Sequence, residues 1–393
     1  MNIQQMRNID TYAGGVACLI LEAIEGIKRL FFTKAAKKPG TIKKILITKY
    51  LGMGSILLAT AMLKALRLRF PDSKIIFLTF DSNARFAKQT HLTDEVVSIK
   101  TSSFSVFAID LLKVLIKIRQ EKFDVVFDLE FFARFSTIVS YLSGAKVRVG
   151  YYLPKLWRGE LLTHQVHFNP YKHITEVFAA QLKTLDIEVT DLSLIPPTVK
   201  EDKIQGVNTL LKEKGIGEGE KIVTVNVNAT DLSMERRWPK ESFIELITYI
   251  TKNKEEAKVV LVGSKDEAGY VKSVYDALPE ESRGRVIDLS GALDIEEFIA
   301  LLKQSALFIT NDSGPLHIAA SLGTSTVSFF GPESPSLYGP VGNHNTFFYR
   351  GIYCSPCLNV YNAKTAMCKG DNQCMKEIKP TYVIDTLVKK GVL

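Results

Sequence analysis

Five residues suited to binding chemistry follow directly after the apolar run ALFIT at 306–310. They are Asn311, Asp312, Ser313, Gly314 and His317. The apolar run predicts a buried strand and 316–322 predicts a helix, so the polar residues form the turn between the two. In open parallel sheets, ligands bind outside the carboxyl ends of strands, where helix amino termini present unpaired N–H groups. This turn is therefore our first candidate for a binding site.

Each residue type in the turn has its own use. Ser313 and Gly314 can offer a hydroxyl and backbone N–H groups to a phosphate, and Gly314 allows close approach because it has no Cβ. Three roles stay open for Asp312, which could cap the helix, hold a divalent metal ion or orient a sugar hydroxyl. His317, one turn into the helix, either faces the same mouth or is a structural histidine.

Two series of strands and helices must position this turn. The expected strands are 42–50, 74–80, 123–129 and 147–152 in the first series, and 221–228, 258–263, 285–291, 306–312 and 325–331 in the second. Strands alternating with helices predict parallel sheets flanked by helices. Adjacent prolines followed by charges within 192–203 indicate a connection between the two series. We therefore expect an α/β chain with two Rossmann-like domains, at 41–195 and 196–379, and a C-terminal helix at 380–393.

The composition agrees with this size and limits the partners. The chain has 393 residues, enough for two domains, and its 46% apolar content is typical of folded proteins. The formal net charge of +8 favours anionic partners. Lysine and arginine are spread along the chain and no recognised nucleic-acid motif appears, so nucleic acid is not an expected partner.

The first 40 residues form a basic, amphipathic segment. Apolar residues recur at three- and four-residue spacing from Val16 to Phe31, which predicts one apolar face of a helix. Glu22, Glu25 and Lys28 interrupt the run, so we expect neither a transmembrane helix nor a signal peptide. Further basic residues follow, at Arg29, Lys34, Lys37 and Lys38. Two interpretations stay open: a helix lying in an anionic membrane interface, or a helix packed on its own domain or on a partner.

Cysteine and histidine are the side chains that most often bind zinc. The segment 351–378 contains Cys354, Cys357, Cys368 and Cys374, which could hold a structural zinc ion or serve as free packing thiols. The histidines of THQVHFNPYKH, His164, His167 and His173, have no carboxylate or cysteine beside them in ligand-like spacing. We expect no metal at these histidines.

Four blocks of the sequence resemble glycosyltransferase family 9, the lipopolysaccharide heptosyltransferase family. The most specific is NDSGPLHIAASLGTSTVSFFGPESP at 311–335. The others, in chain order, are MGSILLATAMLKALRLRFPDSKI, DLEFFARFSTIVSYLSGAKVRVGY and NVNATDLSMERRWPKESF. The resemblance covers about residues 41–390. It implies the GT-B architecture, with two facing Rossmann-like domains of which the first binds the acceptor and the second the nucleotide-sugar.

The resemblance also assigns the donor site. Asp312, Ser313, Gly314 and His317 match the turn that holds the diphosphate and the sugar. Arg236, in ERRWP, takes the place of the basic residue that neutralises the donor phosphates, which suits a leaving group that gains negative charge. The resemblance further places Asn228, Ala229 and Thr230 in the loop near these phosphates.

One position departs from the family pattern. Ser55 stands where the family has the aspartate thought to deprotonate the acceptor hydroxyl, and a serine is too weak a base for this. Either another carboxylate takes the proton or the proton is lost late in a dissociative transition state. Our preferred base is Glu130, with Asp128 behind it, although this pair could instead cap a helix. Gly52, Gly54 and Ser55 would still form a close-approach loop on the acceptor side, where the resemblance also places a contact or hinge role for His173.

Taken together, the sequence predicts an inverting glycosyltransferase at the inner face of the bacterial cytoplasmic membrane. It would move a heptose or related hexose from a nucleotide-diphosphate donor to an anionic lipid-linked saccharide, in lipopolysaccharide or another cell-surface glycan. No cofactor is required, while a magnesium ion at the donor diphosphate and a structural zinc ion stay open. Two alternatives remain: an epimerase-like enzyme acting on nucleotide-sugars, and a catalytically silent binding protein.

Overall fold

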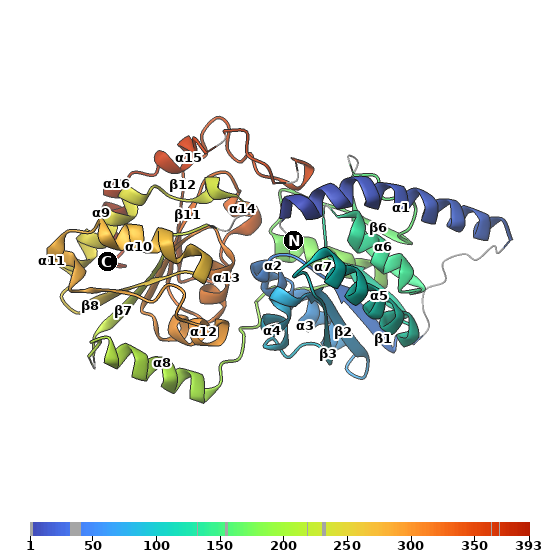
Figure 1. Ribbon diagram of the computed structural model, residues 1–393, viewed down its shortest axis with the longest axis horizontal. Helices are drawn as coiled ribbons and strands as arrows, with labels where there is room; N and C mark the ends of the chain where they lie inside the picture. Colours follow the sequence, from blue (N-terminus) through green and yellow to red (C-terminus); the bar gives the residue numbers. More distant parts are fainter. Residues whose placement is uncertain are drawn as a thin grey trace. The chain divides into compact units, whose positions relative to one another are not determined.

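The computed structural model describes residues 3–31, 41–131, 133–153, 156–217, 219–229, 233–362, 364–368 and 370–393. The chain divides into two compact units, Met1–Ile195 and Pro196–Leu393. Each unit contains a six-stranded parallel sheet flanked by helices (Figure 1). The expected α/β class with two Rossmann-like sheets is confirmed.

The first unit has the strand order β3-β2-β1-β4-β5-β6. The strands are β1 Lys44–Thr48, β2 Lys74–Phe80, β3 Glu95–Ile99, β4 Val125–Asp128, β5 Val147–Tyr152 and β6 His164–His167. The helices are α1 Ile3–Phe31, α2 Met53–Leu58, α3 Thr60–Arg69, α4 Asp81–Lys88, α5 Phe104–Glu121, α6 Arg134–Leu142, α7 Ile174–Ala180 and the 3₁₀ helix η1 Gln181–Leu185. The chain direction across the sheet reverses between β1 and β4, which makes their carboxyl ends the place where a ligand would bind.

The second unit repeats this plan with the strand order β12-β11-β10-β7-β8-β9. The strands are β7 Lys221–Asn226, β8 Ala257–Val262, β9 Val286–Asp288, β10 Leu307–Asn311, β11 Thr326–Phe330 and β12 Asn345–Tyr349. Its helices are α8 Glu201–Glu213, η2 Met234–Arg236, α9 Lys240–Asn253, η3 Lys265–Glu267, α10 Ala268–Asp276, α11 Glu280–Arg283, α12 Ile295–Gln304, α13 Gly314–Ser321, α14 Pro335–Tyr338, η4 Val360–Asn362, α15 Gln373–Lys376 and α16 Pro380–Lys389. The corresponding reversal lies between β7 and β10.

The amino-terminal helix α1 is longer than expected and packs on α6 (Figure 1). Asp10 accepts hydrogen bonds from the backbone N–H groups of Arg134 and Phe135, at 3.0 and 2.7 Å, and so satisfies the first turn of α6. The opposite face of α1 is apolar and exposed, with Leu19 58% and Leu30 83% accessible. Among the described residues, no helix is both long enough and apolar enough to cross a membrane.

Three strands lie where the sequence analysis placed none. These are β3, β6 and β12. They occupy the edges of the two sheets, and their burial alternates or is incomplete, so they lack the continuous apolar runs of the central strands. The segment with His164 and His167 is the edge strand β6. Each of these two rings lies on an edge strand rather than in a common loop.

Candidate anion-binding site of the second unit

The candidate site lies at the carboxyl ends of the adjacent strands β7 and β10. Asn311, at the end of β10, is fully buried and holds the local backbone together. Its Oδ1 accepts from Trp238 N at 2.8 Å, and its Nδ2 donates to Asn228 O at 2.9 Å. Asn311 thus joins the loop after β7 to the segment that follows η2. It positions the site rather than facing a ligand.

Trp238 fixes that same segment in the core. The indole is fully buried, stacks on Phe329 with ring centroids 4.0 Å apart, and donates from Nε1 to Ile378 O at 2.8 Å. Because a buried aromatic of this size has few alternative placements, the residues just before it are held in register. Arg236 is therefore held in place by the burial of Trp238, two positions further along the chain.

Four charged side chains meet next to this anchor. Arg236 Nε lies 3.5 Å from Asp312 Oδ2, and Arg236 Nη2 lies 3.2 Å from Glu333 Oε2. Lys364 Nζ reaches the same Glu333 oxygen at 2.7 Å and sits 4.0 Å from the centre of the Tyr338 ring. All four side chains are at most 11% exposed. We call Arg236, Asp312, Glu333 and Lys364 the charge quartet.

Burial and the mutual pairing act in opposite directions on these groups. Burial raises the pKa of Asp312 above its ordinary value although Arg236 opposes this, and it lowers the pKa of Lys364 although Glu333 opposes this. For Arg236, burial lowers the pKa, but Asp312 and Glu333 outweigh it, so the pKa of this guanidinium is raised. Arg236 is therefore a permanent cation. The two cations balance the charge of the two carboxylates, so the site is neutral before an anionic ligand binds.

Several buried polar atoms at this site have no hydrogen-bond partner among the described residues. They are Asn228 Nδ2, Arg236 Nε and Asp312 Oδ2. Two of the three are donors, and such groups are costly to leave unsatisfied in a folded protein. Asn228 Oδ1, by contrast, accepts from Arg237 Nη2 at 2.7 Å, which fixes the orientation of its amide. Arg236 Nε and Asp312 Oδ2 face each other at 3.5 Å without forming a hydrogen bond, and Asn228 Nδ2 is left as a donor for a ligand that supplies oxygen acceptors.

The turn at the start of α13 completes the site. Ser313 rather than Asp312 occupies the N-cap position, without a side-chain capping hydrogen bond. Ser313 Oγ lies 3.1 Å from Thr310 Oγ1, and Gly314 opens the helix with Pro315 in its first turn. His317 is buried one turn further along. Ala229 is buried in the loop after β7, while Thr230 lies outside the described residues.

Glu333 and Lys364 were missed in the sequence analysis. Glu333 stands in GPESP directly after β11, and a single carboxylate between Gly-Pro and Ser-Pro was a usable signal. Lys364 lies in the cysteine-containing segment, where nothing local distinguishes it from a surface lysine. Only the fold brings it to Glu333, which is 31 positions away in the sequence.

In the first unit, the buried side chain of Glu130 contacts the loop that follows β1. Its Oε1 accepts from the backbone N–H groups of Tyr50 and Leu51, at 2.7 and 3.0 Å, and lies 2.9 Å from Lys49 Nζ. Glu130 is 1% exposed and Lys49 3% exposed. The ion pair thus ties the end of β4 to the loop after β1. Lys49 is a second buried cation that the sequence analysis did not single out.

Asp128 lies deeper still. It is fully buried and accepts from Ser136 Oγ at 2.8 Å and from Glu130 N at 3.0 Å, with Arg158 Nη1 4.0 Å away. Burial raises its pKa from 3.8 to about 6, against the lowering effect of Arg158 and these hydrogen bonds. The carboxyl group therefore lies within the core of the unit.

The loop that Glu130 fixes carries the predicted acceptor-side residues. Gly52 has a φ of +85°, a conformation that favours glycine, and precedes α2. Gly54 is buried and Ser55 is partly exposed within the first turns of α2. His173 is the N-cap of α7, and its Nδ1 lies 2.8 Å from Thr175 Oγ1. The side chain of His173 therefore caps the start of α7.

The cysteines differ widely in their surroundings. Cys354 is exposed, Cys357 and Cys368 are partly buried, and Cys374 is buried. Burial raises the pKa of Cys374 to about 12, and a Cβ added to Gly331 would come within 2.9 Å of its sulfur, which shows close packing. Within the described parts of the chain, no group of three or more His, Cys, Asp or Glu side chains is placed to hold a metal ion.

Comparison with known proteins gives a consistent family. Residues 111–367, more than half of the chain, match the sequence profile of glycosyltransferase family 9 (heptosyltransferase). Lipooligosaccharide heptosyltransferase 2 of Campylobacter jejuni is 30% identical over 173 residues, which cover 44% of this chain and 52% of that protein. The chain thus spans about half the length of this curated relative. Lipopolysaccharide heptosyltransferase 3 of Escherichia coli is 23% identical over 312 residues, 76% of this chain and 87% of that protein.

A solved structure shows the same fold. The structure of Escherichia coli ADP-heptose lipopolysaccharide heptosyltransferase II has a TM-score of 0.70 to this chain, at 18% sequence identity. The match covers 88% of this chain and 98% of that protein. At this identity the likeness concerns the fold alone.

Proposed function

The chain belongs to glycosyltransferase family 9, the heptosyltransferases, and from this premise we propose that it transfers a heptose from a nucleoside diphosphate donor to a hydroxyl of a lipid-linked saccharide. The names of the relatives support lipopolysaccharide or lipooligosaccharide synthesis as the process. ADP-heptose is the donor that we propose, because it appears in the name of a heptosyltransferase with the same fold.

One observation carries the proposal: buried cations and unsatisfied donors meet at the β7–β10 reversal. Arg236, Lys364 and the free Asn228 Nδ2 stand beside the amino terminus of α13. A diphosphate offers many oxygen acceptors and negative charge, which match this set. We propose that Arg236 and Lys364 turn from Glu333 to the phosphates when the donor binds. Asp312 and His317 would then meet the sugar.

The proposed reaction is a direct displacement. The bond between the anomeric carbon and the diphosphate oxygen breaks, and its electron pair leaves with the nucleoside diphosphate. The acceptor hydroxyl forms a new bond to that carbon from the opposite side, which inverts the configuration. Charge on the departing diphosphate grows during this step, so fixed cations stabilise the transition state more than the ground state.

Proton loss from the acceptor needs no strong base in this proposal. Ser55 cannot supply one, and Glu130 is buried, with its Oε1 engaged by Lys49 and two backbone N–H groups. We assign Glu130 a positioning role, with Asp128 supporting it from the core. The acceptor oxygen becomes acidic once its bond to the anomeric carbon is largely formed, and its proton then passes to water.

The acceptor is lipid-linked, so we propose that the enzyme works while attached to the inner face of the cytoplasmic membrane. The exposed apolar face of α1 supports attachment without crossing.

The test is a transfer assay with defined reactants. The purified chain is incubated with ADP-heptose and with lipid-linked saccharide from a strain that cannot make heptose. The mass of the lipid product is then measured by mass spectrometry. We expect a mass gain of one heptose, lost with Arg236→Gln and kept with Arg85→Gln, an exposed arginine of the first unit. Donor turnover without acceptor would favour the epimerase-like alternative. Donor binding with no turnover at all would favour the silent binding protein.

A further inference from the structure

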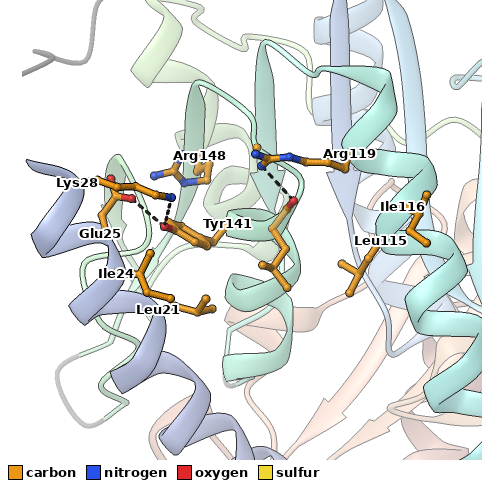
Figure 2. A pocket seen from close by; sticks show the side chains of 11 residues that line it. Leu21, Ile24, Glu25, Lys28, Leu115, Ile116, Arg119, Tyr141 and Arg148 are labelled. Atoms are coloured by element: carbon orange, nitrogen blue, oxygen red, sulfur yellow. Dashed lines mark hydrogen bonds between the residues drawn. The ribbon is translucent and has the colours of Figure 1, made fainter. Parts of the chain in front are cut away.

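The first unit carries a groove between α1, α5 and α6 that the proposed reaction does not use (Figure 2). Its volume is about 590 Å³, within the range of small-molecule sites. One part of its wall is aliphatic and includes Leu21, Ile24 and Leu115. The other part is cationic. The groove is therefore amphipathic within one compact unit.

Three cations and one carboxylate line this groove. The cations are Lys28, Arg119 and Arg148, and the carboxylate is Glu25. Tyr141 donates from its hydroxyl to Glu25 Oε2 at 2.8 Å and accepts from Lys28 Nζ at 3.1 Å, so the Glu25 carboxylate is already engaged (Figure 2). The wall has an excess of positive charge.

The two arginines hold their places differently. Arg148 donates from Nε to Leu161 O and from Nη1 to Ala145 O, at 2.7 and 2.8 Å. Burial lowers the pKa of this guanidinium, so an anion beside it would offset part of the cost of burying its charge. Arg119 is exposed, and its one hydrogen bond to a described residue is the long contact to Leu142 O at 3.4 Å. Arg119 thus has donors to spare.

The helices on either side of the groove expose apolar side chains. On α1, Ile20 and Ile27 are 56% and 57% accessible, and on α5, Leu112 and Ile116 are 61% and 53% accessible. Apolar faces beside a cationic recess are the pattern of a surface that enters an anionic membrane interface. Helix α1 lies outside residues 111–367 that match the family profile, whereas the α5, α6 and β5 residues of the groove lie within them.

We propose that this groove binds one anionic phospholipid of the membrane surface. The phosphate lies among Arg119, Lys28 and Arg148, and an acyl chain lies against Leu21, Ile24 and Leu115. The inference deepens the proposed membrane attachment, on which it rests, by naming the lipid class and the residues that select it. Both parts of the ligand match the wall, because the anionic phosphate meets the cationic side chains and the acyl chain meets the aliphatic side chains.

Vesicle flotation of the full chain tests the selectivity. Phosphatidylcholine vesicles are compared with vesicles that also contain phosphatidylglycerol, without donor or acceptor. We expect binding at least about tenfold tighter to the anionic vesicles, and a loss of about fivefold for Arg119→Gln, as for one cation removed from an anionic surface. Arg85→Gln is the matched control and should bind as wild type does. Equal binding to both vesicle types, or equal loss for both variants, overturns the proposal.

A second pair of substitutions tests the apolar surface beside the groove. Ile116→Asp should weaken vesicle binding by at least about tenfold, since it places a charge in the interface. Leu68→Asp, which alters an exposed leucine of α3, should not. If Ile116→Asp instead turns a dimer in solution into a monomer, the face is an interface between two copies, and the lipid proposal fails.

Native mass spectrometry separates a bound lipid from general surface attraction. The chain released from anionic vesicles should retain one phosphatidylglycerol, and Arg119→Gln should retain about fivefold less, in line with its weaker vesicle binding. Inorganic phosphate at millimolar concentration should not displace the lipid, which distinguishes a lipid site from a phosphate site. Vesicle binding with no retained lipid contradicts the groove. Because no donor is present, failure here leaves the transfer assay above unaffected.

Discussion

Lys364 and Arg236 share one carboxylate oxygen, Oε2 of Glu333, at 2.7 and 3.2 Å. Asp312 Oδ2 lies 3.5 Å from Nε of the same guanidinium, so two carboxylates face the two buried cations. The two carboxylates cancel the charge of the two cations, which therefore lie close together in the folded protein without a ligand. A diphosphate that binds here meets cations that are already in position.

Replacing Lys364 by Met should weaken diphosphate binding specifically. The substitution leaves Arg236 facing two carboxylates, so the quartet becomes negative and repels the phosphates. We expect the affinity for ADP to fall by about tenfold or more, from the loss of one charge-assisted contact. The affinity for adenosine should hardly change. Isothermal titration with both ligands measures this.

The matched control for that experiment is Lys389→Met, an exposed lysine at the end of α16. It removes the same charge from the same unit without touching the quartet. ADP affinity that is unchanged by Lys364→Met, or equally reduced by both variants, would remove Lys364 from the site.

A paired substitution decides between a positioning role and a base role for Glu130. Glu130→Gln leaves Lys49 buried without its counter-charge, which should cost about 3–5 kcal/mol in the free energy of unfolding and reduce transfer. Adding Lys49→Met removes the unpaired charge, so both stability and transfer should largely return. Urea unfolding and the transfer assay give the two readouts. If stability returns while transfer stays absent, Glu130 is the base after all.

The stability of the first unit should depend on pH through Asp128. Its pKa is raised by burial from 3.8 to about 6, so between these values the native state binds more protons than the unfolded state. Stability therefore falls as the pH rises from about 4 to about 6, by an amount on the order of 3 kcal/mol.

Asp128→Asn should abolish that fall. Urea unfolding at a series of pH values, with hydrogen exchange of β4 as the local readout, compares the two proteins. Parallel stability curves for wild type and Asp128→Asn would mean that this carboxyl group titrates as it does in the unfolded chain.

The sequence predicted what depends on local pattern. The buried central strands are continuous apolar runs, and the turn from Asn311 to His317 combines strand end, polar residues and helix start within one short stretch. The edge strands β3, β6 and β12 were missed because half-exposed strands mix polar and apolar residues like loops do. Capping was one of the roles left open for Asp312, but α13 starts at Gly314 rather than at 316, which makes Ser313 the N-cap residue.

Contacts between distant segments were beyond reach for a different reason. Glu130 looked like a free carboxylate at a strand end, and only the fold shows Lys49 and two backbone N–H groups on it. Lys364 reaches Glu333 from a segment dominated by cysteines. Which charged side chains form pairs depends on the order of strands in the sheet and on the conformation of the loops. Neither can be inferred from the spacing of the residues in the sequence.

The most direct measurement is the titration of ADP into the wild-type chain and into Arg236→Gln. We predict one ADP per chain for the wild type and an affinity at least about tenfold lower for Arg236→Gln, because the permanent cation next to Asp312 and Glu333 is lost. No detectable binding of ADP by the wild type at millimolar concentration, or equal binding by both proteins, would contradict the assignment of the diphosphate to this site.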